Sequence, residues 1–335
     1  MPLFLELVRE AASADPQLAR EALSGLRAYQ AASRECAAPA MPEVFRIGPV
    51  SVKDHGGDGP PALLIPSLIN PPRILDLDED VSLASALTSM GRRVLLLDWG
   101  DARSRDLSVA GHVQDLLVPS IRAVAEPVAL VGYCLGGTMA IAAANLVDVD
   151  RVATLAAPWH FKRYPRASLD ALGEMWRGAE PAARSLGALP MEVLQAAFWS
   201  LDPERTVRKF AGFGKLDAAS REARRFVELE DWANEGEPLP YPAARELIED
   251  LFGQDLSGDA KWQVGERIVS DELAVPLLNL TADDDRIAPA TTAPAGAKIG
   301  IASGHVGMIV GSARSKVHDA LRAFLDPLAA GRRWS

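Results

Sequence analysis

One cysteine of this chain lies where an apolar run meets a helix-prone run, between glycines at the spacing of a nucleophile. Cys134 is the centre of Gly132–Gly136, whose sequence is Gly-Tyr-Cys-Leu-Gly. This pattern is the G-x-S-x-G nucleophile elbow with sulfur in place of oxygen. The glycines let the chain pass through a sharp strand-to-helix turn, and the N-terminus of the helix favours a thiolate. The pattern predicts a nucleophilic thiol, the alternative being a glycine-rich turn beside a buried cysteine.

A nucleophilic thiol needs a base, and the place of each histidine in the chain separates the candidates. In α/β-hydrolases the order is nucleophile, acid, histidine, which excludes the two histidines that precede Cys134. His305 lies in the glycine-flanked segment Ser303–Gly307, after the last expected strand, where it can reach over the sheet edge. His160 follows the strand after the elbow and is expected either to line a pocket or to have a structural role. His305 is therefore the predicted base.

The acid that orients the histidine is expected in Thr281–Pro289, which leaves a predicted strand and contains three aspartates. Asp285 precedes a turn that would hold its side chain fixed. Asp283 and Asp284 are interpreted as strand-end or loop carboxylates, because charged side chains clustered in a loop are usually solvated. The position relative to strand and turn thus favours Asp285.

The negative charge that develops on an attacked carbonyl oxygen needs fixed N–H donors. One is expected to be the backbone N–H of Leu135, the residue after the nucleophile. The second is expected from the loop Pro66–Asn70, where either Leu68 or Ile69 would supply it. The sequence leaves this choice open.

Short buried strands alternate with helical patterns along most of the chain, which predicts a mostly parallel sheet with helices on both faces. The expected strands are Ala62–Ile65, Arg93–Asp98, Val128–Val131, Val152–Ala156, Pro276–Leu280 and Ala297–Ile301. The expected helices are Leu3–Ala11, Asp15–Ala32, Ser82–Met90, Val109–Val124, Gly136–Leu146 and Ser315–Leu325. With the elbow, this order predicts the α/β-hydrolase fold.

A polar, mostly helical insertion of about Trp159–Ser270 interrupts the alternation and contains five of the seven tryptophans. It is interpreted as a lid over the C-terminal edge of the sheet, with Trp159 and His160 as substrate-binding residues. The expected organisation is an N-terminal helical segment (1–45), a first core part (46–158), the lid (159–270) and a second core part (271–335).

Composition restricts the class of protein. The 335 residues are 48% hydrophobic and 24% charged, as in ordinary globular proteins, and the net charge of -10 argues against nucleic acid or an anionic membrane as a partner. No apolar run has the length of a membrane span, and the expected location is the cytoplasm. The two cysteines, Cys36 and Cys134, fit a reducing compartment, and a disulfide between them would disable the nucleophile. No Cys/His spacing suggests a metal site.

These segments together resemble the polyhydroxyalkanoate synthases, α/β-hydrolase-fold acyltransferases with a cysteine nucleophile. The resemblance covers roughly residues 60 to 325, and its blocks occur in the family's order. The matching segments are Leu63–Asn70, Val94–Gly100, Gly132–Thr138, Asp285–Pro289 and Gly304–Gly311.

The resemblance implies Cys134 as nucleophile, Asp285 as acid and His305 as base, acting on a 3-hydroxyacyl thioester of coenzyme A without a separate cofactor. The chain has the size of the small family members, which implies a second synthase subunit or a homodimer, and a place at the surface of polyester granules. Two alternatives remain open. The first is a hydrolase of esters, thioesters or polyester oligomers, and the second is a non-catalytic granule-binding or partner-binding protein.

Overall fold

The computed structural model describes residues 2–34 and 41–326, and Cys36 lies outside these residues. The chain divides into two compact units. The sheet unit comprises residues 40–191 and 237–335, and the helical unit comprises residues 1–39 and 192–236. Among the described residues, no helix combines the length and the apolar character needed to cross a membrane.

The sheet unit is built on eight strands in the order β1-β2-β6-β3-β7-β8-β13-β14. From β6 to β14 neighbouring strands are parallel, whereas β2 runs antiparallel to both β1 and β6. Every residue of the central strands β3 and β7 is buried, as expected for a parallel sheet covered on both faces. The strands are β1 (Glu43–Ile47), β2 (Val50–Asp54), β3 (Pro61–Ile65), β6 (Arg93–Asp98), β7 (Ala129–Tyr133), β8 (Arg151–Leu155), β13 (Leu277–Ala282) and β14 (Ala297–Ile301).

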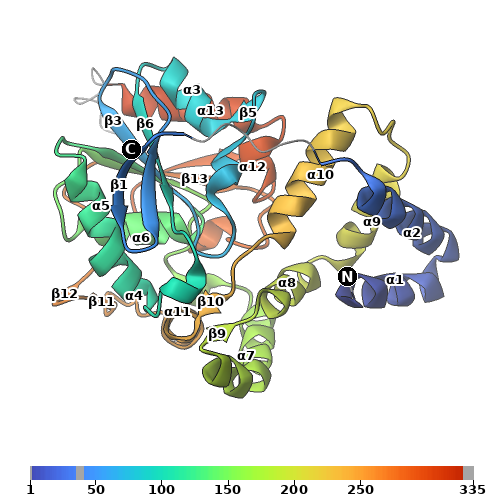
Figure 1. Ribbon diagram of the computed structural model, residues 1–335. Helices are drawn as coiled ribbons and strands as arrows, with labels where there is room; N and C mark the ends of the chain where they lie inside the picture. The colour runs from blue at the N-terminus through green and yellow to red at the C-terminus, as the bar shows by residue number, and fades with distance from the viewer. Residues whose placement is uncertain (1, 35–40, 327–335) are drawn as a thin grey trace. The chain divides into compact units, whose positions relative to one another are not determined.

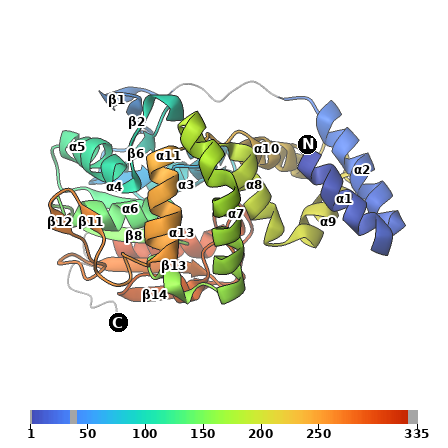
Figure 2. The ribbon, with the colours of Figure 1, turned by 90° about the horizontal axis from the view of Figure 1, so that it is seen from below.

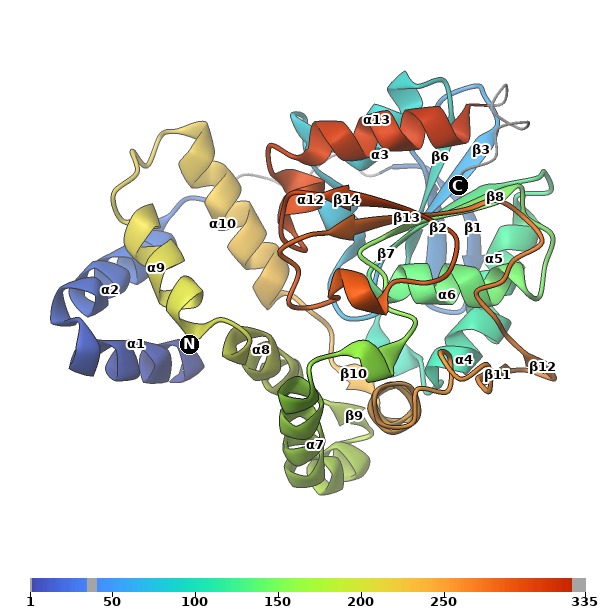
Figure 3. The ribbon, with the colours of Figure 1, turned by 180° about the vertical axis from the view of Figure 1, so that it is seen from behind.

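Helices cover both faces of this sheet (Figure 3). On one face lie α3 (Leu83–Ser89) and α13 (Arg314–Leu325), and on the other lie α5 (Val118–Ala123) and α6 (Leu135–Ala144). The remaining α- and π-helices of the described part of the unit are α4 (Val109–Gly111), the π-helix η3 (His112–Leu117), α7 (Arg166–Leu186), α11 (Tyr241–Arg245), the π-helix η5 (Glu246–Gly253) and α12 (Gly307–Val310). The α/β-hydrolase architecture predicted from the sequence is confirmed.

The hairpin β1–β2 was not among the predicted strands. The prolines and glycines around it indicated turns, but the side chains between them alternate well enough to pair. Val50 and Val52 are buried on the sheet, and Gly48 takes a φ of 55° at the turn, a conformation that suits glycine. The hairpin adds two antiparallel strands to one edge of the parallel sheet.

The helical unit joins two segments that lie far apart in the sequence. Its helices are α1 (Pro2–Ala14), α2 (Pro16–Ala31), most of α8 (Met191–Ser200), α9 (Pro203–Phe213) and α10 (Arg221–Asn234). The N-terminal pair, blue in Figure 1, packs with the yellow α9 and α10, and Figure 2 shows α1, α2 and α9 side by side. The unit is thus held together by contacts between the first 31 residues and the middle part of the insertion, residues 192–236.

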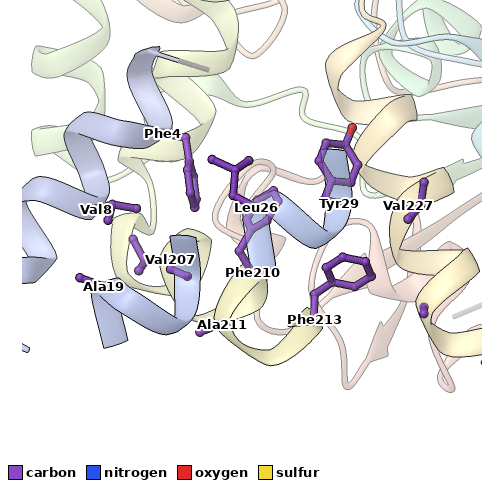
Figure 4. Close-up of a cluster of buried hydrophobic side chains, with 12 residues drawn as sticks. Phe4, Val8, Ala19, Leu26, Tyr29, Val207, Phe210, Ala211, Phe213 and Val227 are labelled. Carbon is purple, nitrogen blue, oxygen red and sulfur yellow. The ribbon is translucent and has the colours of Figure 1, made fainter. Parts of the chain in front are cut away.

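An apolar core fills the space between α1, α2, α9 and α10 (Figure 4). Phe210 is central: its ring lies 4.6 Å from that of Phe4 and 5.8 Å from that of Tyr29. Tyr29 also donates a hydrogen bond of 2.5 Å to Asp231 of α10. The closest approach of α2 to α9 is at Gly25, where a Cβ atom would lie 1.8 Å from the carbonyl oxygen of Phe210. Only glycine fits at this crossing.

The structure therefore draws its boundaries differently from those predicted. The predicted lid, 159–270, does not form one body, because residues 159–191 and 237–270 fold with the sheet unit and only 192–236 fold with the helical unit. The predicted N-terminal segment, 1–45, combines the first two helices with residues 43–45 of β1, a strand of the sheet. The hydrophobic periodicity located the helices, but it does not specify which apolar face packs against which.

Candidate active site

The elbow at Cys134 is the most constrained backbone position of the site. Cys134 adopts φ 55° and ψ −130°, a conformation that side-chain-bearing residues rarely take, and α6 begins at the next residue. A Cβ atom at Gly132 would lie 2.4 Å from Gly137, and one at Gly136 would lie 2.2 Å from the carbonyl oxygen of Ile65. The glycines are needed because β7, α6 and the end of β3 converge there.

His305 and Asp285 form a buried pair. The two oxygens of the Asp285 carboxylate have separate partners: Oδ2 lies 2.7 Å from His305 Nδ1, and Oδ1 accepts hydrogen bonds from the N–H groups of Ile287 (2.8 Å) and Ala288 (2.9 Å). The Asp285 side chain is fully buried, and that of His305 is 8% exposed. The turn after Asp285 thus fixes the carboxylate, and the carboxylate orients the imidazole.

Cys134 interacts with the same imidazole through a hydrogen bond and through its charge. Burial alone disfavours the charged ring, but the charge of Cys134, the hydrogen bonds with Asp285 and Cys134, and the charge of Asp285 outweigh it. Together they raise the pKa of His305 to about 10. A thiol beside an imidazole that is oriented by a buried carboxylate is the arrangement with which proteins generate a nucleophilic thiolate.

The three aspartates of the acid segment have different environments. Asp283 and Asp284 are exposed, and only Asp285 is buried. The backbone N–H groups of Asp283 and Asp284 bond to Ile301 and Ser303, which holds the end of β13 beside the segment that leads to His305. The geometry therefore brings together the aspartate and the histidine that the sequence singled out.

The loop after β3 lies against the start of α6, as the close approach of Gly136 to Ile65 and Pro66 shows. Within this loop the N–H of Ile69 points to Ser67 Oγ at 3.4 Å, and the Ile69 carbonyl accepts from Glu237 N–H at 3.0 Å. Trp99 Nε1 donates to the Pro66 carbonyl at 3.0 Å and steadies the other end. Because Ile69 N–H has an internal partner, Leu68 is the better candidate to act with Leu135.

The two residues predicted to bind substrate are held by other protein groups. His160 Nε2 lies 3.2 Å from Asp271 Oδ2, so its ring has a carboxylate partner. Trp159 is completely buried, packs edge-on against Trp262 at 5.9 Å, and its Nε1 has no hydrogen-bond partner among the described residues. Their backbone N–H groups both bond to the Thr292 carbonyl, which ties them to the loop after Asp285.

Two tyrosines of the site were not singled out from the sequence. Tyr133 lies beside His305 with ring centroids 5.1 Å apart, and Tyr164 donates a 2.7 Å hydrogen bond to the carbonyl of Ile287 in the acid segment. Burial, then the charges of Cys134 and Asp285, raise the pKa of both phenols well above the usual range. Tyr133 could have been suspected because it precedes the nucleophile, but no sequence pattern marks Tyr164.

No group of three or more His, Cys, Asp or Glu side chains gathers in a metal-binding arrangement within residues 2–34 and 41–326. In the same residues Cys134 forms no disulfide and is partly exposed.

Comparison with known proteins identifies the family of the chain. Residues 55–320 match the alpha/beta hydrolase family. The chain belongs to the alpha/beta hydrolase family. The match covers the elbow, the acid segment and the histidine segment. It also covers the insertion, part of which belongs to the helical unit.

Several relatives of the chain are poly(3-hydroxyalkanoate) polymerase subunits PhaC. The protein of Synechocystis sp. is 26% identical over 75% of this chain and 73% of its own length. That of Allochromatium vinosum is 26% identical over 79% of this chain and 80% of its own. The chain matches 53% of the length of the Haloarcula marismortui protein, at 25% identity. The resemblance to the polyhydroxyalkanoate synthases is thereby confirmed.

Solved structures of other hydrolase-family proteins share the fold. A lipase in its open form superimposes with a TM-score of 0.55 at 15% identity, covering 88% of this chain and 100% of the lipase. An esterase from Exiguobacterium antarcticum gives a TM-score of 0.51 at 14% identity, covering 82% of this chain and 95% of the esterase. At these identities the likeness concerns the fold alone.

Proposed function

We propose that this protein is an acyltransferase of the polyhydroxyalkanoate synthase type, which acts on 3-hydroxyacyl thioesters of coenzyme A through an acyl-cysteine intermediate. The observation that supports it most is a cysteine at the elbow of a fold whose buried His305–Asp285 pair stands ready to take the thiol proton. The curated polymerase relatives point to the same chemistry.

In the first half-reaction, His305 takes the proton of Cys134 Sγ, and the thiolate attacks the thioester carbonyl carbon. The carbonyl electron pair moves to oxygen, where the backbone N–H groups of Leu135 and Leu68 would stabilise it. Collapse of this intermediate breaks the bond to the coenzyme A sulfur, which leaves with the proton held by His305. The products are free coenzyme A and an acyl group on Cys134.

In the second half-reaction, His305 takes the proton of a 3-hydroxyl group on another acyl thioester. The hydroxyl oxygen attacks the acyl-Cys134 carbonyl, an ester forms, and the Cys134 thiolate leaves. Asp285 keeps Nδ1 protonated and orients the ring throughout. The reaction exchanges a thioester for an ester and needs no separate cofactor.

Water in place of the second hydroxyl would make the same site a hydrolase, and a fold that is shared with lipases and esterases is compatible with this second candidate. Which acceptor is used depends on how well water is excluded from the acyl-enzyme.

The deciding experiment incubates the purified protein with 3-hydroxybutyryl-coenzyme A and follows coenzyme A release, free acid and insoluble polyester. Polyester indicates a synthase, and free acid indicates a hydrolase. Absence of turnover, with the Cys134→Ala variant as matched control, would favour a non-catalytic binding protein, unless a second synthase subunit restores activity.

We expect slow thioester hydrolysis and weak or absent polymerisation from the isolated chain, because the small family members act with a second subunit. A homodimer, a cytoplasmic location and a place at the polyester granule surface are further parts of this proposal. Vigorous polymer formation by the chain alone would contradict the need for a second subunit.

A further inference from the structure

Tyr164 contacts the acid segment from outside the Cys134, His305 and Asp285 set. Its hydroxyl donates to the Ile287 carbonyl at 2.7 Å, and the N–H of the same residue donates to Asp285 Oδ1 at 2.8 Å. The peptide group before Ile287 is held by the Asp285 carboxylate, and the peptide group after it is held by both the carboxylate, through Ala288 N–H at 2.9 Å, and the phenol. The phenol is thus a hold on the turn from outside it, and without it the turn keeps only its internal hydrogen bonds to Asp285 among these contacts.

The Tyr164 ring is itself immobilised. It packs against Phe252, at a centroid distance of 5.0 Å, and against Phe161, at 6.0 Å in a stacked arrangement, and these two rings also contact each other. The N–H of Phe161 is bound at 2.7 Å by the buried carboxylate of Asp255. This aromatic group gives the hydroxyl of Tyr164 a defined position.

Tyr133 contacts His305 in two ways. Its ring lies beside the imidazole, with centroids 5.1 Å apart and planes at 35°, and its hydroxyl donates to the His305 carbonyl at 3.3 Å. Because Tyr133 is the last residue of β7 and directly precedes Cys134, it links the rigid elbow to the loop that carries the imidazole. Both the ring and the backbone of His305 are restrained from one residue.

We propose that Tyr133 and Tyr164 are positioning residues of this site, Tyr133 for His305 and Tyr164 for Asp285. The inference rests on the proposed function for what the site is used for. Its test does not rest on that function, because it measures the reactivity of Cys134 and not turnover. Neither phenol touches the reacting atoms in the proposed mechanism. Tyr164 holds the loop that follows β13 and carries Asp285, and Tyr133 holds the loop that follows β14 and carries His305.

The test measures how fast iodoacetamide alkylates Cys134 as a function of pH, because only the thiolate reacts appreciably. Mass spectrometry of the peptide that contains Cys134 separates it from Cys36. Misplacing the imidazole or its acid weakens the thiolate–imidazolium pair, so the thiolate forms at higher pH. For Tyr133→Phe and Tyr164→Phe we expect the rate at pH 7 to fall about three- to tenfold, the scale of one neutral hydrogen bond.

Tyr241→Phe is the matched control, because the Tyr241 hydroxyl donates a 2.7 Å hydrogen bond to Glu180 and Tyr241 has no contact with His305 or Asp285 among the described residues. Its alkylation curve should superimpose on that of the unchanged protein. Tyr133→Leu, which also removes the ring, should show a larger shift than Tyr133→Phe.

The outcomes separate this inference from the proposed function. If His305→Ala shifts the alkylation curve and neither Phe variant does, while their melting temperatures fall, the tyrosines are structural and the inference is wrong. If His305→Ala leaves the curve unchanged, the thiol does not depend on the imidazole, and both proposals fail. If the curves shift as expected but no thioester is turned over, the positioning role stands and the proposed function does not.

Discussion

The sheet unit and the helical unit reach stability by different means. In the sheet unit, the strand pairs β1–β2, β3–β6, β7–β8 and β13–β14 each join elements that are close in the chain, and only β8–β13 spans the insertion. In the helical unit, the first 31 residues pack against residues 203–234, and its core is almost entirely apolar. The fold of the sheet unit is specified mostly by strands that are close in the chain. The fold of the helical unit is specified by the matching of apolar helix faces.

The candidate site residues all belong to one of the two units. All the residues that the sequence singled out for the site lie in the sheet unit, as does the strained backbone at Cys134. Strain of this kind costs about 1–3 kcal/mol and persists only where the surroundings impose it. The rigid β7–α6 junction imposes this strain. The helical unit consists of packed helices and contains none of the site residues. The contrast predicts that substitutions in the two units will affect different measurements.

The largest expected effect is the loss of turnover in Cys134→Ala, because no other group can carry the acyl intermediate in the proposed mechanism. Cys134→Ser and His305→Ala should be nearly as severe, with losses of about 10⁴-fold or more. Coenzyme A release from the thioester is the measurement, and circular dichroism confirms that the variants fold. Turnover in Cys134→Ala comparable to that of the unchanged chain would contradict the mechanism.

Asp285→Asn should lower turnover by about 10²- to 10⁴-fold, because the amide still fits the turn but cannot stabilise the imidazolium. The matched control is Asp284→Asn, an exposed neighbour for which we expect less than a twofold change. The same thioester assay measures both. A severe loss in Asp284→Asn with a mild one in Asp285→Asn would show that the wrong acid had been assigned.

In the helical unit, Gly25→Ala should destabilise the packing of α2 on α9 by about 1–3 kcal/mol, because the added carbon would overlap the Phe210 carbonyl. Gly212→Ala is the control, since nothing lies within 4 Å of a Cβ atom at that helical position. Hydrogen exchange measures the effect: α2 and α9 should lose protection in Gly25→Ala, and β3 and β7 should keep it. An equal loss of protection in both units would contradict the proposed difference between the sheet unit and the helical unit.

The smallest effect is a dependence of stability on pH that belongs to the sheet unit, which contains all five histidines. Burial, together with the charge of Arg105, lowers the pKa of His112 from 6.5 to about 4. Between these values the unfolded chain binds a proton that the folded chain does not, so stability falls with acidification. From pH 7 to 5.5 we expect His112 to contribute a loss of about 1 kcal/mol in the free energy of unfolding, taken as the difference between the unchanged chain and His112→Gln.

Urea unfolding at the two pH values gives this difference, and hydrogen exchange assigns it to a unit. In His112→Gln the pH slope should shrink. A slope that is unchanged in this variant, or one that appears first in α2 and α9, would assign the titration to other groups.

Much of the sheet unit could be predicted because its signals are local. An apolar run marks the parallel strands β3, β6 and β7, and Gly132 and Gly136 mark the elbow through a steric need that the sequence displays. Asp285 could be preferred over Asp283 and Asp284 because a turn follows it, and the structure shows that turn donating two N–H groups to its carboxylate.

Other features depend on contacts that no local pattern records. The helix periodicity of α1 and α2 shows an apolar face but not its partner, which is why the predicted domain boundaries differ from the observed units. Tyr164 was missed for the same reason: its partner, Ile287, lies 123 positions further along the chain. The hairpin β1–β2 was obscured by the turn residues on either side of it.

The discontinuous core of the helical unit sets the order in which the chain can fold during synthesis. Tyr29 and its partner Asp231 are 202 positions apart, so α1 and α2 leave the ribosome long before α9 and α10 exist. At the usual rate of elongation this interval lasts roughly 10–40 s, during which Phe4, Val8 and Leu26 lack their partners on α9 and α10. The apolar faces that α1 and α2 turn toward those helices stay uncovered for this time, and slower translation would lengthen the time they spend prone to aggregation.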